Sequence, residues 1–500
     1  MADMQSSAPS PKGRQPGGVA GLDQGHLSKS RLVLFALTAM TPGTGMALVP
    51  ILVFGYVGET SWASLLVAML AAVCIGAAVR VFARRYIVSG SLYSYVGEVL
   101  GTWGRRVVGA SLLLGFIAML AAVVAQCGLF AGSFLTSIGV HHANGVLGQA
   151  LIYIVVLTIS AYIVIIGLSA SLRTSLILSG IAVPPILVIT IASAAHTGLR
   201  LSSQFDFSGM TWNGVFQGVV GALAFLIGFE SCAALAVETK DPKRSVPLAL
   251  MGVPVILAIM WIIPTVAQVP GLADASRQIA SGQSAPAALA VQAGLGESFA
   301  KATDLIFAFE AFVAIIGFLS YGSRVFATLA TEGLLPRRIA DVSARLHTPV
   351  KSIVTLSALG LLTMVCTMAD VGDITNGFTV VATLLTYAWT PSYLLAAIGA
   401  IVLLVRDLRG PGRSARSWIG SFAACVVVVV TVVGIYVNGV INPPPAPYDA
   451  AIWIAAVALG AVILVYTVGP VVRSRCGGGF LARHNPAEND PDSRAIAVPE

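Results

Sequence analysis

Long apolar stretches separated by short polar loops make up most of this chain. Twelve of them are long enough to cross a bilayer as a helix, which takes about 20 residues. This pattern predicts an all-α polytopic membrane protein with twelve transmembrane helices. The expected spans lie near residues 32–56, 61–83, 105–137, 147–168, 174–196, 214–238, 246–270, 302–330, 350–369, 374–405, 418–440 and 450–472.

The two ends of the chain lack such stretches. Residues 1–31 and 473–500 are polar, and the first of these segments is rich in Gly, Pro and Ser without an apolar core. We therefore expect two disordered cytoplasmic tails around a membrane domain over residues 32–472.

Composition and charge agree with a membrane location. Hydrophobic residues are 57% of the chain and charged residues only 10%, against about 25% charged in a soluble domain. Most of the 29 Lys and Arg lie in alternate loops, and the opposite loops hold only Arg200, Arg277 and Lys301. The positive-inside rule then predicts a multi-pass protein of the cytoplasmic membrane with both termini inside.

The same distribution excludes other partners. The net charge of +7 lies in short loops and not on a soluble face, so we expect no nucleic-acid partner, only the lipid bilayer. The six cysteines form no CxxC pair. We expect neither a disulfide framework nor a metal site, and no cofactor.

Two expected helices contain helix-breaking residues near their centres. The first reads LFALTAMTPGTGMALVPIL, with Pro42 between Thr41 and Gly43, and the sixth reads GALAFLIGFESCAAL, with Gly228 and Glu230. Gly and Pro are also common where membrane helices merely kink for packing. Matched breaks in two halves are nevertheless the best sequence pointer to the binding site of a secondary transporter.

The breaks match if helices 1–5, about 32–196, and helices 6–10, about 214–405, are repeats. Five spans per repeat force the second copy to insert upside down, and two extra helices remain at about 418–472. Free N–H groups of Gly43, Thr44 and Gly45 would favour a carboxylate. Free carbonyls at residues 225–228 would favour an ammonium group, so the pair suits a small α-amino acid.

Three separate motifs resemble a known family. FLIGFESCAALAVETKDPKRSVPLAL is similar to the helix 6 signature of the amino acid–polyamine–organocation (APC) superfamily permeases. FARRYIVSGSLYSYVGEVLGTWG, residues 82–104, and GSRVFATLATEGLLPRRIADVSARLHTPVKSI, residues 322–353, resemble its segments after helices 2 and 8. The resemblance implies a transporter domain with a five-plus-five inverted repeat, broken helices 1 and 6, and two extra helices.

Carried over position by position, the resemblance implies a substrate site at the two breaks. Two departures limit it: helix 5 has no lysine to take part in coupling, and helix 1 reads TPGTG, so side-chain specificity does not transfer. The implied site residues are Thr41, Gly43, Thr44, Gly45, Phe225, Ile227, Gly228, Phe229 and Glu230.

The buried polar residues leave alternatives open. Glu230 either exchanges a proton or is a structural acceptor for the unwound helix 6, and Glu310 either carries a proton or faces an outer vestibule. Arg324 either snorkels or caps an inner gate, or binds substrate. Ser320 and Ser323 either hold sodium with helix 1 carbonyls or serve packing. Gln126 is a further specificity candidate, and ETKDPKRS, residues 238–245, is expected to be a solvated inner loop.

The sequence therefore predicts a secondary active transporter that takes up amino acids by alternating access, coupled to H+. The alternatives are an exchanger, a polyamine or amine permease, or a Na+ symporter on the same fold. An enzyme is not expected, because the chain has no HExxH, GxSxG or GxxxxGK[ST] motif. A channel or a non-transporting sensor is the alternative from another class.

Overall fold

The computed structural model describes residue 25 and residues 27–88, 90–280, 282–343, 345–407 and 415–476. The predicted tails fall largely outside these residues. Within them, eleven helical stretches are long and apolar enough to cross a membrane, and the described part of the chain has no strand beyond one isolated bridge, Leu27 with Thr239. The prediction of an all-α polytopic membrane protein is confirmed.

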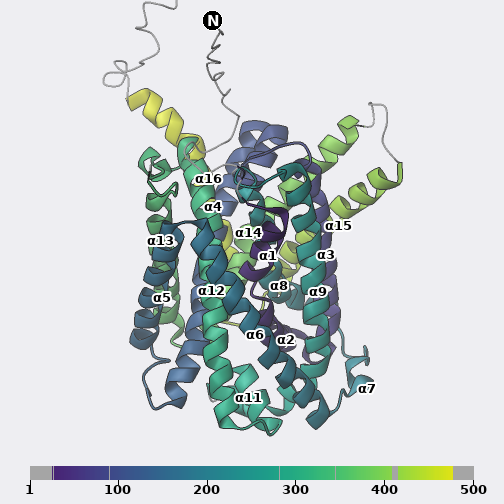
Figure 1. Ribbon diagram of the computed structural model, residues 1–500. Helices are drawn as coiled ribbons and strands as arrows, with labels where there is room; N and C mark the ends of the chain where they lie inside the picture. The colour runs from purple at the N-terminus through teal and green to yellow at the C-terminus, as the bar shows by residue number, and fades with distance from the viewer. Residues whose placement is uncertain are drawn as a thin grey trace, which may run out of the picture.

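The helices form an upright bundle (Figure 1). The end of α16 lies at one face of the bundle, and α7 and α11 lie at the opposite face. In chain order the elements are α1 Lys29–Ala39, α2 Pro42–Val57, η1 Gly58–Thr60, α3 Ser61–Ala83, α4 Ser91–Ser137, α5 Val146–Ile166, α6 Leu168–Thr197, α7 Leu201–Gln204, α8 Trp212–Leu226, η2 Phe229–Leu235, α9 Pro242–Asp274, α10 Ser276–Ala280, α11 Ala285–Gln292, α12 Glu297–Thr331, η3 Arg337–Ala340, α13 Val350–Val371, α14 Ile374–Asp407, α15 Ala415–Ile441 and α16 Ala451–Cys476.

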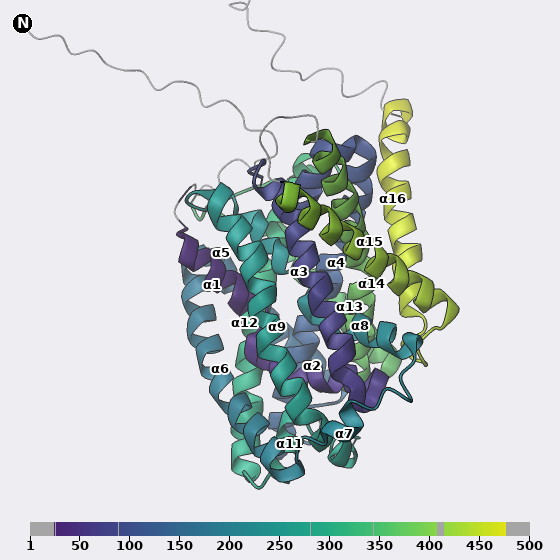
Figure 2. The same ribbon diagram turned by 90° about the vertical axis from the view of Figure 1, so that its right-hand side faces the viewer.

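The first of the eleven stretches holds two of the expected spans. It runs over Lys29–Ala83, 55 residues, which would extend about 80 Å if straight, against a hydrocarbon core of about 30 Å. The chain turns at Gly58, where φ is 62°, so α1 and α2 run toward one face and α3 returns (Figure 2). The count of twelve crossings and the inverted repeat stay predictions.

Most helix bounds agree with the expected spans within a few residues, and α4 is the main exception. It begins at Ser91 and bends at Gly101, where φ is 67° and ψ is −154°. Only glycine adopts this backbone readily. The segment before the bend is polar and aromatic, so hydropathy alone does not reveal it as helix.

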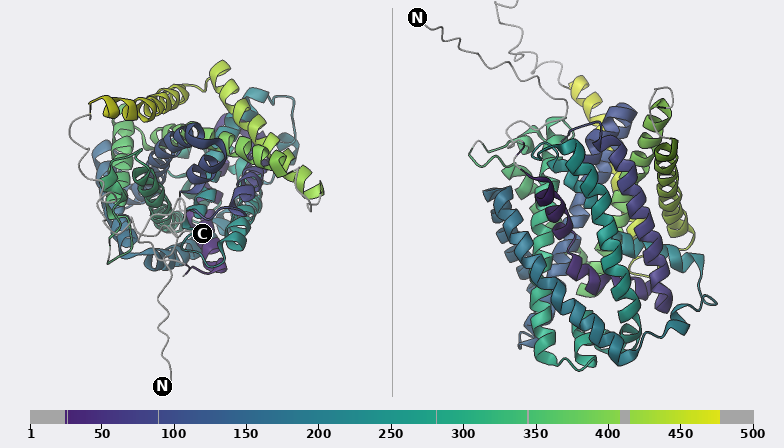
Figure 3. Two further views of the ribbon diagram at one scale, coloured as in Figure 1. Left: turned by 90° about the horizontal axis from the view of Figure 1, so that it is seen from above. Right: turned by 45° about the vertical axis from the view of Figure 1, so that its right-hand side comes forward.

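The centre of the bundle is α4, which packs against α12 and α14, while α2 packs against α8 and α9, and α3 against α9. The two last helices, α15 and α16, lie at the edge of the bundle (Figure 3). Small residues allow the close contacts: a Cβ at Gly115 of α4 would lie 2.6 Å from the ring of Trp389 on α14. This packing holds the two broken helices, α1–α2 and α8–η2, inside the protein.

The contact between α3 and α9 supplies a test of the packing. A Cβ at Gly76 would collide with the carbonyl oxygen of Leu250, which is backbone and cannot turn aside, whereas a Cβ at Gly252 meets nothing within 4 Å. We expect Gly76→Val to lower the free energy of unfolding by about 1–3 kcal/mol through overpacking, measured as thermal stability in detergent. Gly252→Val is the matched control, and equal stability of the two variants would contradict the helix pairing.

Candidate functional site

The break in the first membrane helix is short. Helix α1 ends at Ala39, and Thr41, with φ of 41°, precedes Pro42 at the first position of α2. Gly43, Thr44 and Gly45 form the first turn of α2. The physical reason is that proline suits the first turn of a helix, where its missing N–H has no partner to lose.

The start of α2 carries a carboxylate from a distant helix. The N–H of Gly43 donates to Glu310 Oε1 at 2.9 Å, and the N–H and hydroxyl of Thr44 donate to Oε2, the hydroxyl at 2.6 Å. The N–H of Gly45 instead bonds the Thr41 carbonyl at 2.8 Å. Glu310 is fully buried, so it does not face an outer vestibule, and the free amides expected at Gly43 and Thr44 are occupied in this conformation.

The second break lies between α8 and η2. Ile227 is extended and Gly228 has φ of 94°, a conformation that favours glycine. A side chain would also not fit, because a Cβ at Gly228 would lie 2.7 Å from Cε1 of Phe318. The N–H of Gly228 donates to Tyr393 Oη at 3.0 Å, so a side chain replaces the lost helical bond.

Glu230 follows this break and is fully buried. Trp389 Nε1 donates to its Oε1 at 2.9 Å, and Tyr393 Oη donates to its Oε2 at 2.6 Å. The desolvation of the carboxylate is thus offset by two donors of α14. Sequence reasoning did not find Trp389 and Tyr393; their only signal is an i, i+4 spacing of aromatic residues with polar tips.

A cavity lies between the two breaks. Its volume is small, about 30 Å³, against roughly 10–15 Å³ needed for each water molecule. Of the predicted site residues, Thr41, Phe225 and Ile227 line it, and the others are not among its lining residues. The lining is almost entirely apolar: Ala39, Met40, Thr41, Met119, Ala122, Val123, Gln126, Ala224, Phe225, Ile227, Ala314, Phe318, Phe378, Ala382 and Leu385.

Two lining side chains are distinctive. Phe225 packs edge-on against Trp261 and Phe378, with ring centroids 6.2 and 6.1 Å apart, which fixes its ring at the cavity wall. Gln126 of α4 is only 3% exposed, and its Nε2 has no hydrogen-bond partner among the described residues. A buried amide without a partner is costly, so Gln126 is suited to bind a ligand in the cavity.

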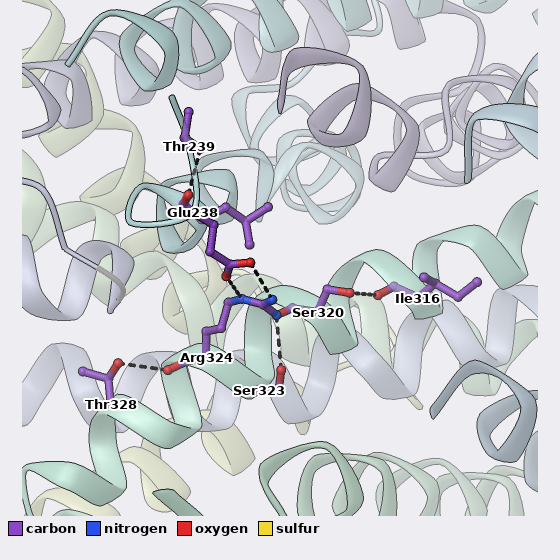
Figure 4. Close-up of polar contacts among 8 residues, drawn as sticks. Glu238, Thr239, Ile316, Ser320, Ser323, Arg324 and Thr328 are labelled. Atoms are coloured by element: carbon purple, nitrogen blue, oxygen red, sulfur yellow. Dashed lines mark hydrogen bonds and ion pairs between the residues drawn. The ribbon is translucent and has the colours of Figure 1, made fainter. Parts of the chain in front are cut away.

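A buried ion pair joins α12 to the chain that follows η2. Arg324 pairs with Glu238 through Nε and Nη2, and its Nη1 donates to the Ser320 carbonyl at 2.6 Å (Figure 4). Both ionic side chains are 3% exposed. The expectation that Glu238 belongs to a solvated loop is therefore wrong, and Arg324 does not snorkel, because the chain at Gly25 and Leu27 pairs with residues 237–240 and covers them.

Ser320 and Ser323 lie beside this ion pair (Figure 4). Their hydroxyls donate to carbonyls of their own helix, those of Ile316 and Ser320, at 2.8 and 3.2 Å. The guanidinium of Arg324 is the cation next to them. A sodium ion at the same place would be repelled by that charge, so these contacts favour the packing role over a sodium site.

The outer side is closed by a hydroxyl–carboxylate cluster that sequence reasoning missed. Asp304 of α12 is buried and accepts hydrogen bonds from Ser133 of α4, at 2.6 Å, and from Ser284. The Ser284 hydroxyl also accepts from the Ala287 N–H at 3.2 Å, which caps α11. The sequence did contain a signal for this cluster, because Asp304 is an acidic residue inside the expected span 302–330.

The chain matches known proteins over most of its length. The profile of a family described as "Amino acid permease" matches residues 27–464. The chain is also similar to the branched-chain amino acid permease BcaP of Lactococcus lactis subsp. cremoris (strain MG1363), 25% identical over 296 residues, and of Bacillus subtilis (strain 168), 24% over 299. These alignments cover 55% and 57% of this chain.

The coverage of these relatives is partial. The alignments span 61% and 63% of the two branched-chain permeases, less than two thirds of their length. A cationic amino acid transporter 1 of Arabidopsis thaliana is 26% identical over 309 residues, which is 59% of this chain and 50% of that protein.

The contacts of Glu230 yield a stability prediction. In Glu230→Gln one amide oxygen still accepts, but the amide NH₂ faces a donor, so a buried group loses its partner. We expect the free energy of unfolding to fall by about 1–3 kcal/mol, seen as a lower melting temperature in detergent. Asp370→Asn, at an exposed acid on α13, should not change stability; an unchanged Glu230→Gln variant would contradict the arrangement.

The buried ion pair of Arg324 and Glu238 yields a second stability prediction. Arg324→Met or Glu238→Met alone leaves an unpaired buried charge, which we expect to cost about 3–5 kcal/mol, whereas the double variant removes both charges and should recover most of the loss. A double-mutant cycle on thermal or denaturant unfolding measures this coupling. Additive losses in the double variant would show that the two side chains do not depend on each other.

Proposed function

This chain belongs to the amino acid permease family, and from that premise we propose that it is a secondary active transporter. We infer that it carries amino acids with apolar side chains across the cytoplasmic membrane by alternating access. The observation that carries this proposal is the apolar cavity between the two helix breaks. The breaks bring backbone polar groups next to its apolar lining.

The lining of the cavity supports an apolar side chain. Alanine, methionine, valine, leucine and phenylalanine form its walls, and Thr41 and Gln126 are its polar side chains. No acidic residue lines it to balance a cationic side chain. The names of the branched-chain permeases match this chemistry better than that of the cationic transporter.

The helix ends support recognition of the amino group. Ala39 and Met40 at the end of α1 and Ala224 and Phe225 at the end of α8 line the cavity, and the last carbonyls of a helix have no partner within it. Two helix C-termini thus direct partial negative charge at one place, where an ammonium group is stabilised. Gln126 Nε2, in contrast to these carbonyls, is a hydrogen-bond donor, and it suits an oxygen atom of the substrate.

Alternating access requires each side of the site to open in turn. On the inner side the pair of Arg324 and Glu238 would have to separate, and on the outer side the cluster of Asp304 with Ser133 and Ser284. We assign the two groups as inner and outer gates. The inner face is taken to be cytoplasmic because the Lys- and Arg-rich loops lie there.

Coupling to H+ is supported by the two buried carboxylates at the breaks, Glu230 and Glu310. Both are 0% exposed, and a carboxylate at bilayer depth that faces the protein interior is a candidate proton carrier. Sodium coupling has less support, because Arg324 provides the positive charge beside Ser320 and Ser323.

Transport by purified protein in liposomes tests the proposal. Labelled leucine, valine, alanine, lysine, glutamate and putrescine would be offered under a pH gradient, a sodium gradient, or with preloaded substrate. We expect concentrative uptake of leucine or valine driven by the pH gradient. Uptake only with preloaded amino acid would mean an exchanger, uptake of putrescine alone an amine permease, and no flux by folded protein would overturn transport.

The alanines of the cavity generate a specificity prediction. Ala122→Leu adds three carbon atoms to a small site, so we expect uptake of leucine to fall at least tenfold more than uptake of alanine, given about 1–3 kcal/mol per misfit methylene. The ratio of kcat/KM for the two substrates in liposomes measures this. Ala369→Leu, on the exposed face of α13, is the control, and an unchanged ratio in Ala122→Leu would displace the site from this cavity.

A further inference from the structure

The start of α2 holds an unusual pairing that the proposed function leaves unexplained. We define the amide cradle as the N–H groups of Gly43 and Thr44 with the Thr44 hydroxyl. These donors at a helix N-terminus are suited to bind an anion, and all three donate to the carboxylate of Glu310. The protein therefore fills its own anion site with a side chain 267 residues away in the chain.

The amide cradle borders the cavity. Thr41, which lines the cavity, is two residues before Gly43, the first donor of the cradle. On α12, Ala314 and Phe318 line the cavity and lie four and eight residues after Glu310, on the same helix face. Glu310 is thus one turn beyond the cavity wall, within the reach of a substrate whose ammonium group lies at the ends of α1 and α8.

We propose that Glu310 is a resident competitor of the substrate: its carboxylate and the substrate carboxylate occupy the amide cradle in turn, and a proton taken up by Glu310 releases the cradle. This rests on the proposed function and deepens it. It makes the α-carboxylate a required part of the substrate and Glu310 the group through which the proton gradient acts.

The hydrogen bonds explain why a proton releases the cradle. An ionised carboxylate accepts at both oxygens, and charged acceptors form the stronger bonds. A proton on Oε2 would remove the charge and point a donor at the N–H of Thr44, which cannot accept it, and the Thr44 hydroxyl would have to turn from donor to acceptor. The proton comes from water on the outer side and remains on the Glu310 oxygen, and no covalent bond of the substrate changes.

The number of buried carboxylate charges stays the same during the exchange, while the net charge rises by one with the proton. Before binding, the cradle holds ionised Glu310; after binding, it holds the substrate carboxylate while Glu310 is neutral. The buried site then contains one carboxylate charge in both states, so the desolvation cost of a second buried anion is avoided. Because binding linkage is reciprocal, substrate binding promotes protonation of Glu310 as much as protonation promotes binding.

Glu230 does not fit this role. Its acceptors are used by Trp389 and Tyr393, which are side chains of α14, and neither residue lines the cavity. Release of Glu230 would leave two buried donors without partners, whereas release of Glu310 is compensated by the substrate.

The charged groups of the elements packed around Glu310 are as follows. The cradle and Ala182 of α6 are its neighbours at the start of α2, and α2, α5 and α11 contain no Asp, Glu, Lys, Arg or His. Nearest along its own helix is Asp304, six residues away and bonded to two serines. The remaining acidic, basic and histidine residues of the elements around α12 and α2 are Lys29 and Arg31 of α1, Glu59 of η1, Arg80 of α3, Glu98, Arg105 and Arg106 of α4, Arg173 and His196 of α6, Glu230 of η2, Lys243, Arg244 and Asp274 of α9, Glu297, Lys301 and Arg324 of α12, Arg337 and Arg338 of η3, and Lys351 and Asp370 of α13.

Equilibrium binding to the full chain in nanodiscs tests the proposal. Two probes are compared between pH 5 and pH 8: L-leucine, and 3-methylbutylamine, which is leucine without its carboxylate. We expect the Kd of leucine to fall up to about tenfold for each unit of decreasing pH while one proton is linked. The Kd of the amine should not change, because it does not need the cradle.

Variants separate Glu310 from other titrating groups. Glu310→Gln should bind leucine with no pH dependence and at neutral pH at least as tightly as the unaltered protein does at pH 5. Glu297→Gln, at an exposed acid on the same helix, should keep the slope. If Glu310→Gln does not fold, Thr44→Val is the second test. It removes the hydroxyl donor to the Glu310 carboxylate, so the carboxylate is bound less strongly. The pH at which leucine binding is half-maximal should then move to a higher value.

The outcomes that overturn the proposal are distinct from those that overturn transport. A pH slope that persists in Glu310→Gln, or that is equal for leucine and the amine, shows that Glu310 does not compete for the cradle. Tight amine binding with exclusion of leucine at every pH shows that Glu310 never leaves it. If folded protein binds neither leucine nor any other amino acid of the panel, the proposed function itself fails.

Discussion

The need to satisfy backbone polar groups at membrane depth governs this structure. A helix that breaks in the bilayer leaves N–H and C=O groups that neither lipid nor water can satisfy. Here each break obtains partners from other helices: Glu310 of α12 and Trp261 of α9 bond the first turn of α2, and Tyr393 of α14 bonds Gly228. The breaks exist because α9, α12 and α14 surround them.

This constraint also explains where charge is buried. Glu310 and Glu230 each lie at a break, and each is ligated by donors that the break or its neighbours provide. The two differ in their donors. Glu310 accepts from backbone amides and a hydroxyl at the start of α2, while Glu230 accepts from the indole of Trp389 and the phenol of Tyr393.

The site is closed on both sides by different chemistry. On the inner side a guanidinium and a carboxylate share a buried pair, and on the outer side two hydroxyls bind one carboxylate. A buried ion pair opens with difficulty unless water reaches both partners, whereas hydroxyl contacts exchange readily with water. Between them lies the cavity of about 30 Å³.

The sequence by itself determined the membrane class, the span positions and the location of both breaks, because these depend on local properties: apolar length, and the backbone limits of Pro42 and Gly228. It also showed that Glu230 is buried. Only the tertiary structure decided what each polar group contacts. The amides of Gly43 and Thr44 read as free in sequence and are held by Glu310, and Glu238 read as a loop residue and lies buried against Arg324. A hydrogen-bond partner is chosen by the packing of helices distant in the chain, which no local pattern records.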